Sequence, residues 1–214
     1  VSAPHINLGE IMGTQSKSSA TIAVAAADPD GLSTAASVGN NAALTLGGAL
    51  TSGGSFTAES GTARQITLLS AGDDSAKSFT VVGTDVNGDA LTESVTGAND
   101  DTATSTGYFA TVSSITAVGN PAGNMSAGTS INVAGVIFKG PARVKNLVWT
   151  GGGAVGTINI RNSGTAGTSF IDVRSDATLG VNASVNLTDG VHFPNGAYVT
   201  FAETQCNSVT AFFE

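Results

Sequence analysis

Short alternations of apolar and polar residues run through most of the chain from Thr21 onward, and clusters of Gly, Asn or Asp interrupt them. Alternation with a period of two predicts β-strands, because successive side chains of a strand point to opposite faces of a sheet. Breaks about every 8–12 residues are typical of sandwiches and barrels. No segment has a convincing helical periodicity, so the sequence predicts an all-β fold.

The expected strands form two groups, with a soft boundary near residues 137–140. The first group is expected at residues 21–26, 43–47, 64–69, 78–84, 90–96, 108–117 and 131–138. The second group is expected at residues 142–149, 155–161, 168–173, 183–187, 197–202 and 208–213. This division predicts two β-sandwich or jelly-roll-like units, residues 21–138 and 139–214. An irregular arm over residues 1–20 precedes them, and its apolar residues favour an arm laid on a neighbouring protein over a frayed end.

Turn chemistry predicts several connections. Residues 28–31, Asp-Pro-Asp-Gly, form a strong turn signal and limit the preceding Ala-rich piece to one helical turn at most. Asn87-Gly88 predicts a type I′ hairpin turn between alternating strands. The Gly-, Ala- and Ser-rich residues 119–130 are expected to be a linker or a long loop. The three glycines 151–153 predict a tight hairpin between the strands on either side.

Charge narrows the possible partners. The chain has 214 residues, a formal net charge of −8 and a sequence pI of about 4.5, so the phosphate backbone of a nucleic acid should repel it. Residues 1–138 carry the whole acidic excess, whereas residues 139–214 are neutral and hold most of the aromatic residues. Burying a neutral, aromatic surface avoids desolvating carboxylates. The C-terminal unit is therefore the expected docking end.

The titratable residues offer no catalytic constellation. A hydrolytic triad would need His5 or His192 beside a nucleophile and an acid, and no motif supplies them. His192 is expected to pack or hydrogen-bond locally beside a turn. The single Cys206 allows no intrachain disulfide and is expected to be a small buried residue, compatible with folding in a reducing cytoplasm. The chain is therefore not expected to be an enzyme, and it has no expected catalytic or cofactor-binding residues.

Acidic clusters give little reason to expect a metal. Asp85, Asn87 and Asp89 faintly resemble a calcium loop, but their spacing does not fit an EF-hand, and a hairpin turn explains the same residues. Residues 73–74 and 99–101 are expected to be solvated loop ends. No His or Cys cluster suits zinc. No signal-peptide pattern or apolar run near 18 residues occurs, so neither secretion nor membrane insertion is expected.

Several strings resemble a β-rich module of tailed-bacteriophage structural proteins: ARQITLLSAGDD, FTVVGTDVNGDALTESVTGA and YFATVSSITAV within residues 63–118. The ending, with GVHFPNGAYVTF and SVTAFFE, looks like the C-terminal strands of the same kind of protein. The resemblance implies a virion component made in the bacterial cytoplasm. It carries no catalytic residues.

Two structural roles and one binding role follow as hypotheses. The first is a capsid decoration or cement protein, a homo-oligomer expected to be a trimer, that binds the major capsid protein lattice and stabilises the head. The second is a tail, knob or head-fibre component. The third is a carbohydrate-binding sandwich used in host attachment, although sugar sites usually need exposed aromatics and few are expected outside the strands.

Overall fold

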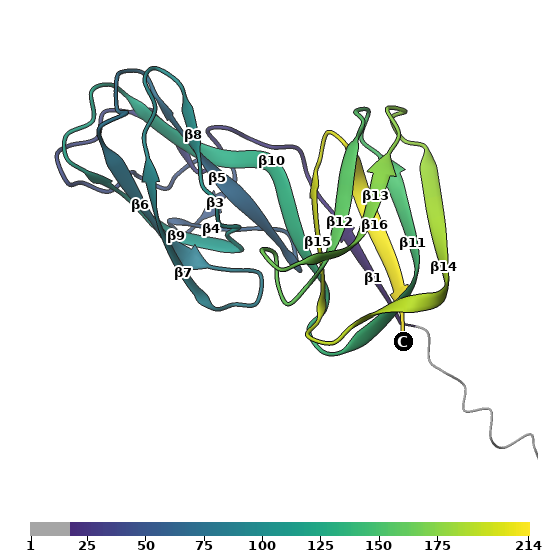
Figure 1. Ribbon diagram of the computed structural model, residues 1–214. Helices are drawn as coiled ribbons and strands as arrows, with labels where there is room; N and C mark the ends of the chain where they lie inside the picture. The colour runs from purple at the N-terminus through teal and green to yellow at the C-terminus, as the bar shows by residue number, and fades with distance from the viewer. Residues whose placement is uncertain (1–17) are drawn as a thin grey trace, which may run out of the picture.

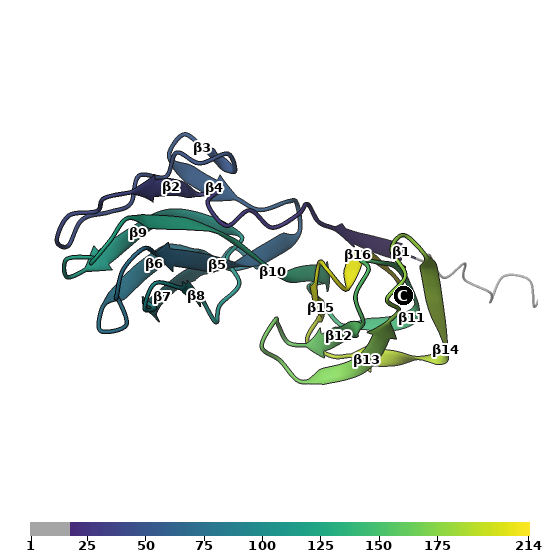
Figure 2. The same ribbon diagram turned by 90° about the horizontal axis from the view of Figure 1, so that it is seen from above.

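The computed structural model describes residues 18–214, which contain sixteen strands and no helix (Figure 1). The all-β expectation is confirmed. The expected arm falls mostly outside the described residues, and its last three residues, 18–20, begin the first strand. The strands form two lobes that lie side by side in both ribbon views (Figures 1 and 2).

The C-terminal lobe is built from strands at both ends of the chain. Its strands are β1 (Ser18–Ala23), the second half of β10 (Met125–Phe138), β11 (Ala142–Gly151), β12 (Gly156–Asn162), β13 (Ser169–Ser175), β14 (Asn182–Phe193), β15 (Ala197–Ala202) and β16 (Cys206–Phe213). One sheet has the order β1-β16-β11-β14, and β10, β15, β12 and β13 follow one another in the facing sheet.

These eight strands have jelly-roll topology. Their antiparallel pairs are nested, because the first strand pairs with the last, β1 with β16, and the pairs β10–β15, β11–β14 and β12–β13 follow inward. Such nesting places successive pairs alternately in the two packed sheets and is characteristic of the jelly roll. The jelly-roll-like expectation therefore describes this lobe.

The N-terminal lobe is inserted between the first two strands of the jelly roll. It contains β2 (Ser33–Ala36), β3 (Thr51–Ser52), β4 (Ser55–Thr57), β5 (Thr62–Ser70), β6 (Ser78–Thr84), β7 (Ala90–Thr96), β8 (Thr102–Thr104), β9 (Thr111–Val118) and the first half of β10. One sheet has the order β3-β4-β9-β6-β7, and it faces β8, β5, β10 and β2. This lobe is a second sandwich.

Strand β10 belongs to both lobes. It pairs with β5 from Met125 to Gly135 and with β15 from Asn132 onward, so one seven-stranded sheet runs from lobe to lobe. The expected boundary near residue 138 falls at the end of this strand. The structure instead divides the two cores within β10, and β1 lies with the C-terminal lobe although it precedes the other lobe in sequence.

Each lobe has its own hydrophobic core. The core of the C-terminal lobe includes Ile22 from β1, Val133 from β10 and the indole of Trp149. The core of the N-terminal lobe is centred on Phe79, Phe109 and the aliphatic residues around them. A smaller cluster of Ala63, Val86 and Tyr198 lies between the two. The two cores and the shared strand together hold the lobes as one folded unit.

Residues 125–130 are the clearest departure from the expected secondary structure. They form the start of β10 and not a linker. The reason is close packing: a Cβ at Gly128 would lie 2.0 Å from the carbonyl oxygen of Asp28, in the predicted turn. Small residues therefore let the turn backbone lie directly on the strand. Conversely, the expected strand at 43–47 forms only an isolated bridge at Ala43, although Leu44 and Leu46 enter the core.

The glycines at 151–153 do not form a hairpin, because β11 and β12 lie in different sheets. The chain crosses between the sheets there, and other loops approach its backbone closely. A Cβ at Gly151 or Gly152 would lie 2.3 Å from the carbonyl oxygen of Thr178 or Glu203, respectively. These glycines are needed for close approach of three loops at one end of the jelly roll.

The β6–β7 hairpin is present, but its turn type was predicted incorrectly. Of the two residues expected at positive φ, only Gly88 has it (+90°). The loop closes through an N–H···O bond from Asp85 to Asp89, and the Asp85 carboxylate accepts the N–H groups of Asn87 (2.8 Å) and Asp89 (3.0 Å). Side-chain capping by Asp85 thus selects a longer loop than a two-residue turn.

Candidate functional site

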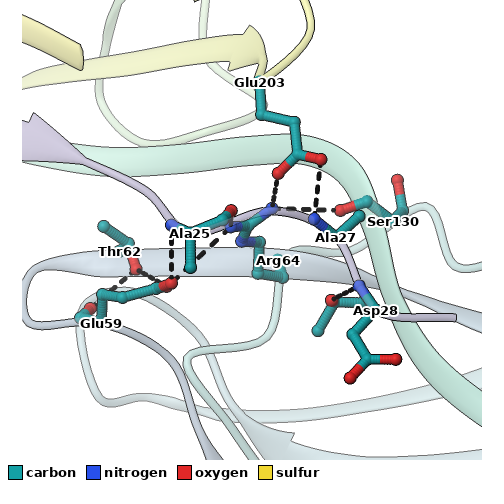
Figure 3. A network of polar contacts seen from close by, with 9 residues as sticks. Ala25, Ala27, Asp28, Glu59, Thr62, Arg64, Ser130 and Glu203 are labelled. Carbon is teal, nitrogen blue, oxygen red and sulfur yellow. Dashed lines mark hydrogen bonds and ion pairs between the residues drawn. The ribbon is translucent and has the colours of Figure 1, made fainter. Parts of the chain in front are cut away.

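A buried arginine joins the two lobes at the point where the chain passes from one to the other (Figure 3). Arg64 lies on β5, and its side chain is only 2% exposed. Its Nη1 donates to Glu203 Oε2 at 2.9 Å and to the carbonyl oxygen of Ser130, and its Nη2 donates to the carbonyl oxygen of Ala25. Glu203 lies between β15 and β16, so this ion pair connects the N-terminal lobe to the jelly roll.

The segment that leaves β1 is fixed by the same network. The N–H of Ala25 donates to Glu59 Oε1 (3.0 Å), that of Ala27 to Glu203 Oε1 (2.7 Å), and that of Asp28 to Thr129 Oγ1 (3.1 Å). Burial alone would raise the pKa of Glu59, but hydrogen bonds from the backbone and the charge of Arg64 together hold it below its usual value. The network is structural, since its charges and donors are satisfied by one another.

A second contact between the lobes involves the β6–β7 loop. The hydroxyl of Tyr198 on β15 donates to Asn87 Oδ1 at 2.9 Å, and Lys139 Nζ donates to the Asn87 carbonyl oxygen at 3.1 Å. Burial raises the pKa of Tyr198. In the loop that faintly resembled a calcium site, the side chains of Asp85 and Asn87 therefore bond within the protein, whereas Asp89 is exposed. Among residues 18–214, no three His, Cys, Asp or Glu residues gather closely enough to hold a metal ion.

Asp74 does not fit the expectation of a solvated loop end. It is completely buried, and it accepts hydrogen bonds from the hydroxyl of Ser70 (2.5 Å) and from the N–H of Ala122 (2.8 Å). It thereby fixes the 119–124 loop against the end of β5. Its neighbour Asp73 is exposed, as expected.

Of the two histidines, only His192 lies within the described residues. His192 is exposed at the end of β14, opposite Arg143 on β11, and His5 lies outside the described residues. No helix within residues 18–214 has the length and apolar character needed to cross a bilayer.

Cys206 is fully buried beneath the jelly-roll sheets, as expected. Burial raises the pKa of its thiol to about 11, partly offset by hydrogen bonding with Ser208 and Thr150. Because the thiolate is the reactive species, we expect the folded protein to react with Ellman's reagent at pH 8 at least about 100-fold more slowly than the unfolded chain. Release of one thiol equivalent per chain in guanidinium is the control. Rapid labelling of the folded protein would contradict the burial.

Exposed aromatic rings gather at one end of the jelly roll. Phe138 is 41% exposed and packs at a tilt against Phe213 with ring centroids 5.2 Å apart, and Phe170 is 44% exposed and packs at a tilt against Phe193 at 5.3 Å. These rings lie where β10, β14 and β16 end and where β13 begins. We call Phe138, Phe170, Phe193 and Phe213 the aromatic end.

A shallow groove of about 330 Å³ opens beside the aromatic end. Phe212, Phe213, Asn146 and Asn186 line it, and an ion pair between Lys145 and Glu214 (3.1 Å) lies at its side. The groove is mainly apolar, and its flanking charges cancel. The neutrality and aromatic content of this lobe are evident from the sequence, whereas the exposure of individual rings depends on the fold.

Comparisons with protein-family models, with curated proteins and with solved structures gave no match.

Proposed function

We propose that this chain is a structural component of a tailed-phage virion, and that it decorates the head by attaching to the capsid lattice through the aromatic end. The observation that carries the proposal is the pair of half-exposed phenylalanines on a neutral jelly roll. Fully buried aromatic anchors are the residues that dominate protein interfaces, and partial exposure in the free chain leaves area to bury on binding.

The charge distribution supports the same orientation. The excess of acidic residues lies outside residues 139–214, so the aromatic end can be buried without desolvating those carboxylates. Jelly rolls occur in viral capsid proteins and in lectins, which agrees with a virion role but does not select it. A protein that binds the assembled shell and not its free subunits stabilises the shell by mass action.

The alternative is a tail, knob or head-fibre component, with or without carbohydrate binding. One observation favours carbohydrate binding. The groove beside Phe212 combines an aromatic ring with the amide side chains of Asn146 and Asn186. Aromatic stacking and amide hydrogen bonds are suited to a polar ligand such as a sugar.

Copy number in purified particles tests the proposal. Quantitative mass spectrometry of particles from the phage that encodes the chain should find hundreds of copies for a head decoration protein, whereas six or twelve copies would favour the tail alternative. Replacing Phe138 and Phe170 with alanine should reduce rebinding to particles stripped of the protein by at least about 10-fold. Val118→Ala, an exposed residue of the N-terminal lobe, is the control. Absence of the chain from the particles would exclude both virion roles.

A further inference from the structure

The first half of strand β14 is a free edge without the usual protection against pairing. It is hydrogen-bonded only to β11, and within residues 18–214 no strand covers its other side. Natural proteins guard such edges with charged residues, proline, bulges or very short strands. Residues 182–188, Asn-Ala-Ser-Val-Asn-Leu-Thr, contain no charge and no proline.

Two of the other edge strands are guarded, whereas β1, the opposite edge of the same sheet, also carries neither charge nor proline. The facing edge strand, β13, presents exposed Asp172 and Arg174, and β3 has only two residues. On β14 the register with β11 jumps between Asn186 and Val191, which limits the regular edge to the residues before the jump. The unguarded part is therefore a segment of ordinary strand length that runs into an irregularity.

The side chains of this segment show that its core side is incompletely covered. Ala183, Val185 and Leu187 point toward the core but are only half-buried. Two of the most exposed apolar residues, Leu179 (68%) and Val181 (49%), immediately precede the strand. A strand added at this edge would cover apolar surface as well as satisfy backbone groups.

We propose that β14 pairs antiparallel with β14 of a second copy, about a two-fold axis at Ser184. In this register Ala183 lies opposite Val185 of the other copy, and Val181 lies opposite Leu187. The apolar residues of both copies then share one face, continuous with the two cores, and the exposed polar residues share the other. An antiparallel match of a segment with itself is the isologous interface of a two-fold dimer.

The self-matching register favours a second copy as the occupant, and charge permits it. Two chains of net charge −8 repel each other, so they associate best where neither carries charge, and this segment meets that condition. The proposal replaces the trimer expected from the sequence with a dimer. It does not depend on the virion function, because the purified chain tests it.

Light scattering on the full chain at tens of micromolar gives the first test. The expected mass is twice the 21.0 kDa of one chain, and substitution of both Ser184→Lys and Asn186→Lys should abolish the dimer. These side chains are exposed, so the fold should persist, as circular dichroism can verify. The control is Ser19→Lys with Thr21→Lys, at exposed positions on the opposite edge of the same sheet, which should remain dimeric.

Cross-linking gives a second test that does not depend on the lysine variants folding. Ser184→Cys should form a disulfide-linked dimer with oxidised glutathione as the oxidant, whereas Thr21→Cys should not, and buried Cys206 should not contribute. A monomeric or trimeric wild-type mass would overturn the proposal. The proposal would also be overturned if the dimer persisted in the Ser184→Lys, Asn186→Lys variant or dissociated in the Ser19→Lys, Thr21→Lys variant. Stronger cross-linking of Thr21→Cys than of Ser184→Cys would overturn it as well.

Discussion

Residues 139–214 expressed alone should give no cooperative unfolding transition. This fragment is the C-terminal unit expected from the sequence, but it lacks β1 and β10, two of the eight strands of the jelly roll. Ile22 and Val133 would be missing from the core, and β16 and β15 would become new unprotected edges. Thermal and urea denaturation followed by circular dichroism would measure the loss.

A matched chain should restore folding. Residues 18–24 joined by a flexible linker to residues 131–214 contain all eight strands. Both ends of the join are anchored near the β15–β16 connection, because the N–H of Val24 donates to the carbonyl oxygen of Asn207 and the carbonyl oxygen of Ile131 accepts the N–H of Glu203. The division of the lobes within β10 would be contradicted if the 139–214 fragment unfolded cooperatively. It would also be contradicted if the joined chain showed no cooperative unfolding transition.

Replacing Arg64 with alanine should lower the free energy of unfolding by about 3–5 kcal/mol, the usual cost of removing one partner from a buried ion pair. Glu203 would lose its cation, and the carbonyl oxygens of Ala25 and Ser130 would lose a donor. Urea denaturation of the full chain measures the change.

The control for Arg64 is Arg174→Ala, which removes an exposed guanidinium and should change stability by less than about 0.5 kcal/mol. The double variant Arg64→Met with Glu203→Gln should recover part of the loss, because it removes the uncompensated charge together with its partner. A loss below about 1 kcal/mol in Arg64→Ala would mean that the ion pair does not hold the lobes together.

The strands were predictable where alternation was strong. The segments 64–69, 78–84, 90–96 and 197–202 all correspond to observed strands, since most of the apolar residues in each face one core. What the sequence does not contain is the partner of each strand. Pairing of Ser18 with Phe213 is a contact between opposite ends of the chain, and no local pattern encodes it.

Two predictions, for Gly128 and for Asp74, were wrong. In the sequence Gly128 resembles a linker residue, but in the structure the backbone of Asp28 lies directly against it. Such a close approach produces no periodic pattern of apolar residues in the sequence. Asp74 resembles a solvated acid, yet it is buried because Ser70 and Ala122 supply its hydrogen bonds. The aromatic end was foreseen as a lobe rich in rings, whereas the exposure of Phe138 and Phe170 depends on where their strands end.

The nested pairing of β1 with β16 also determines the order in which the chain can fold. As the chain leaves the ribosome, the N-terminal lobe has all its residues once β10 has emerged, but β1 must wait until the last strand, Cys206–Phe213, is synthesised. Contacts this distant in sequence slow folding, and unpaired strands are prone to aggregation meanwhile. We therefore expect the jelly roll to close last, with the inserted lobe already folded and holding β10 in place as a template.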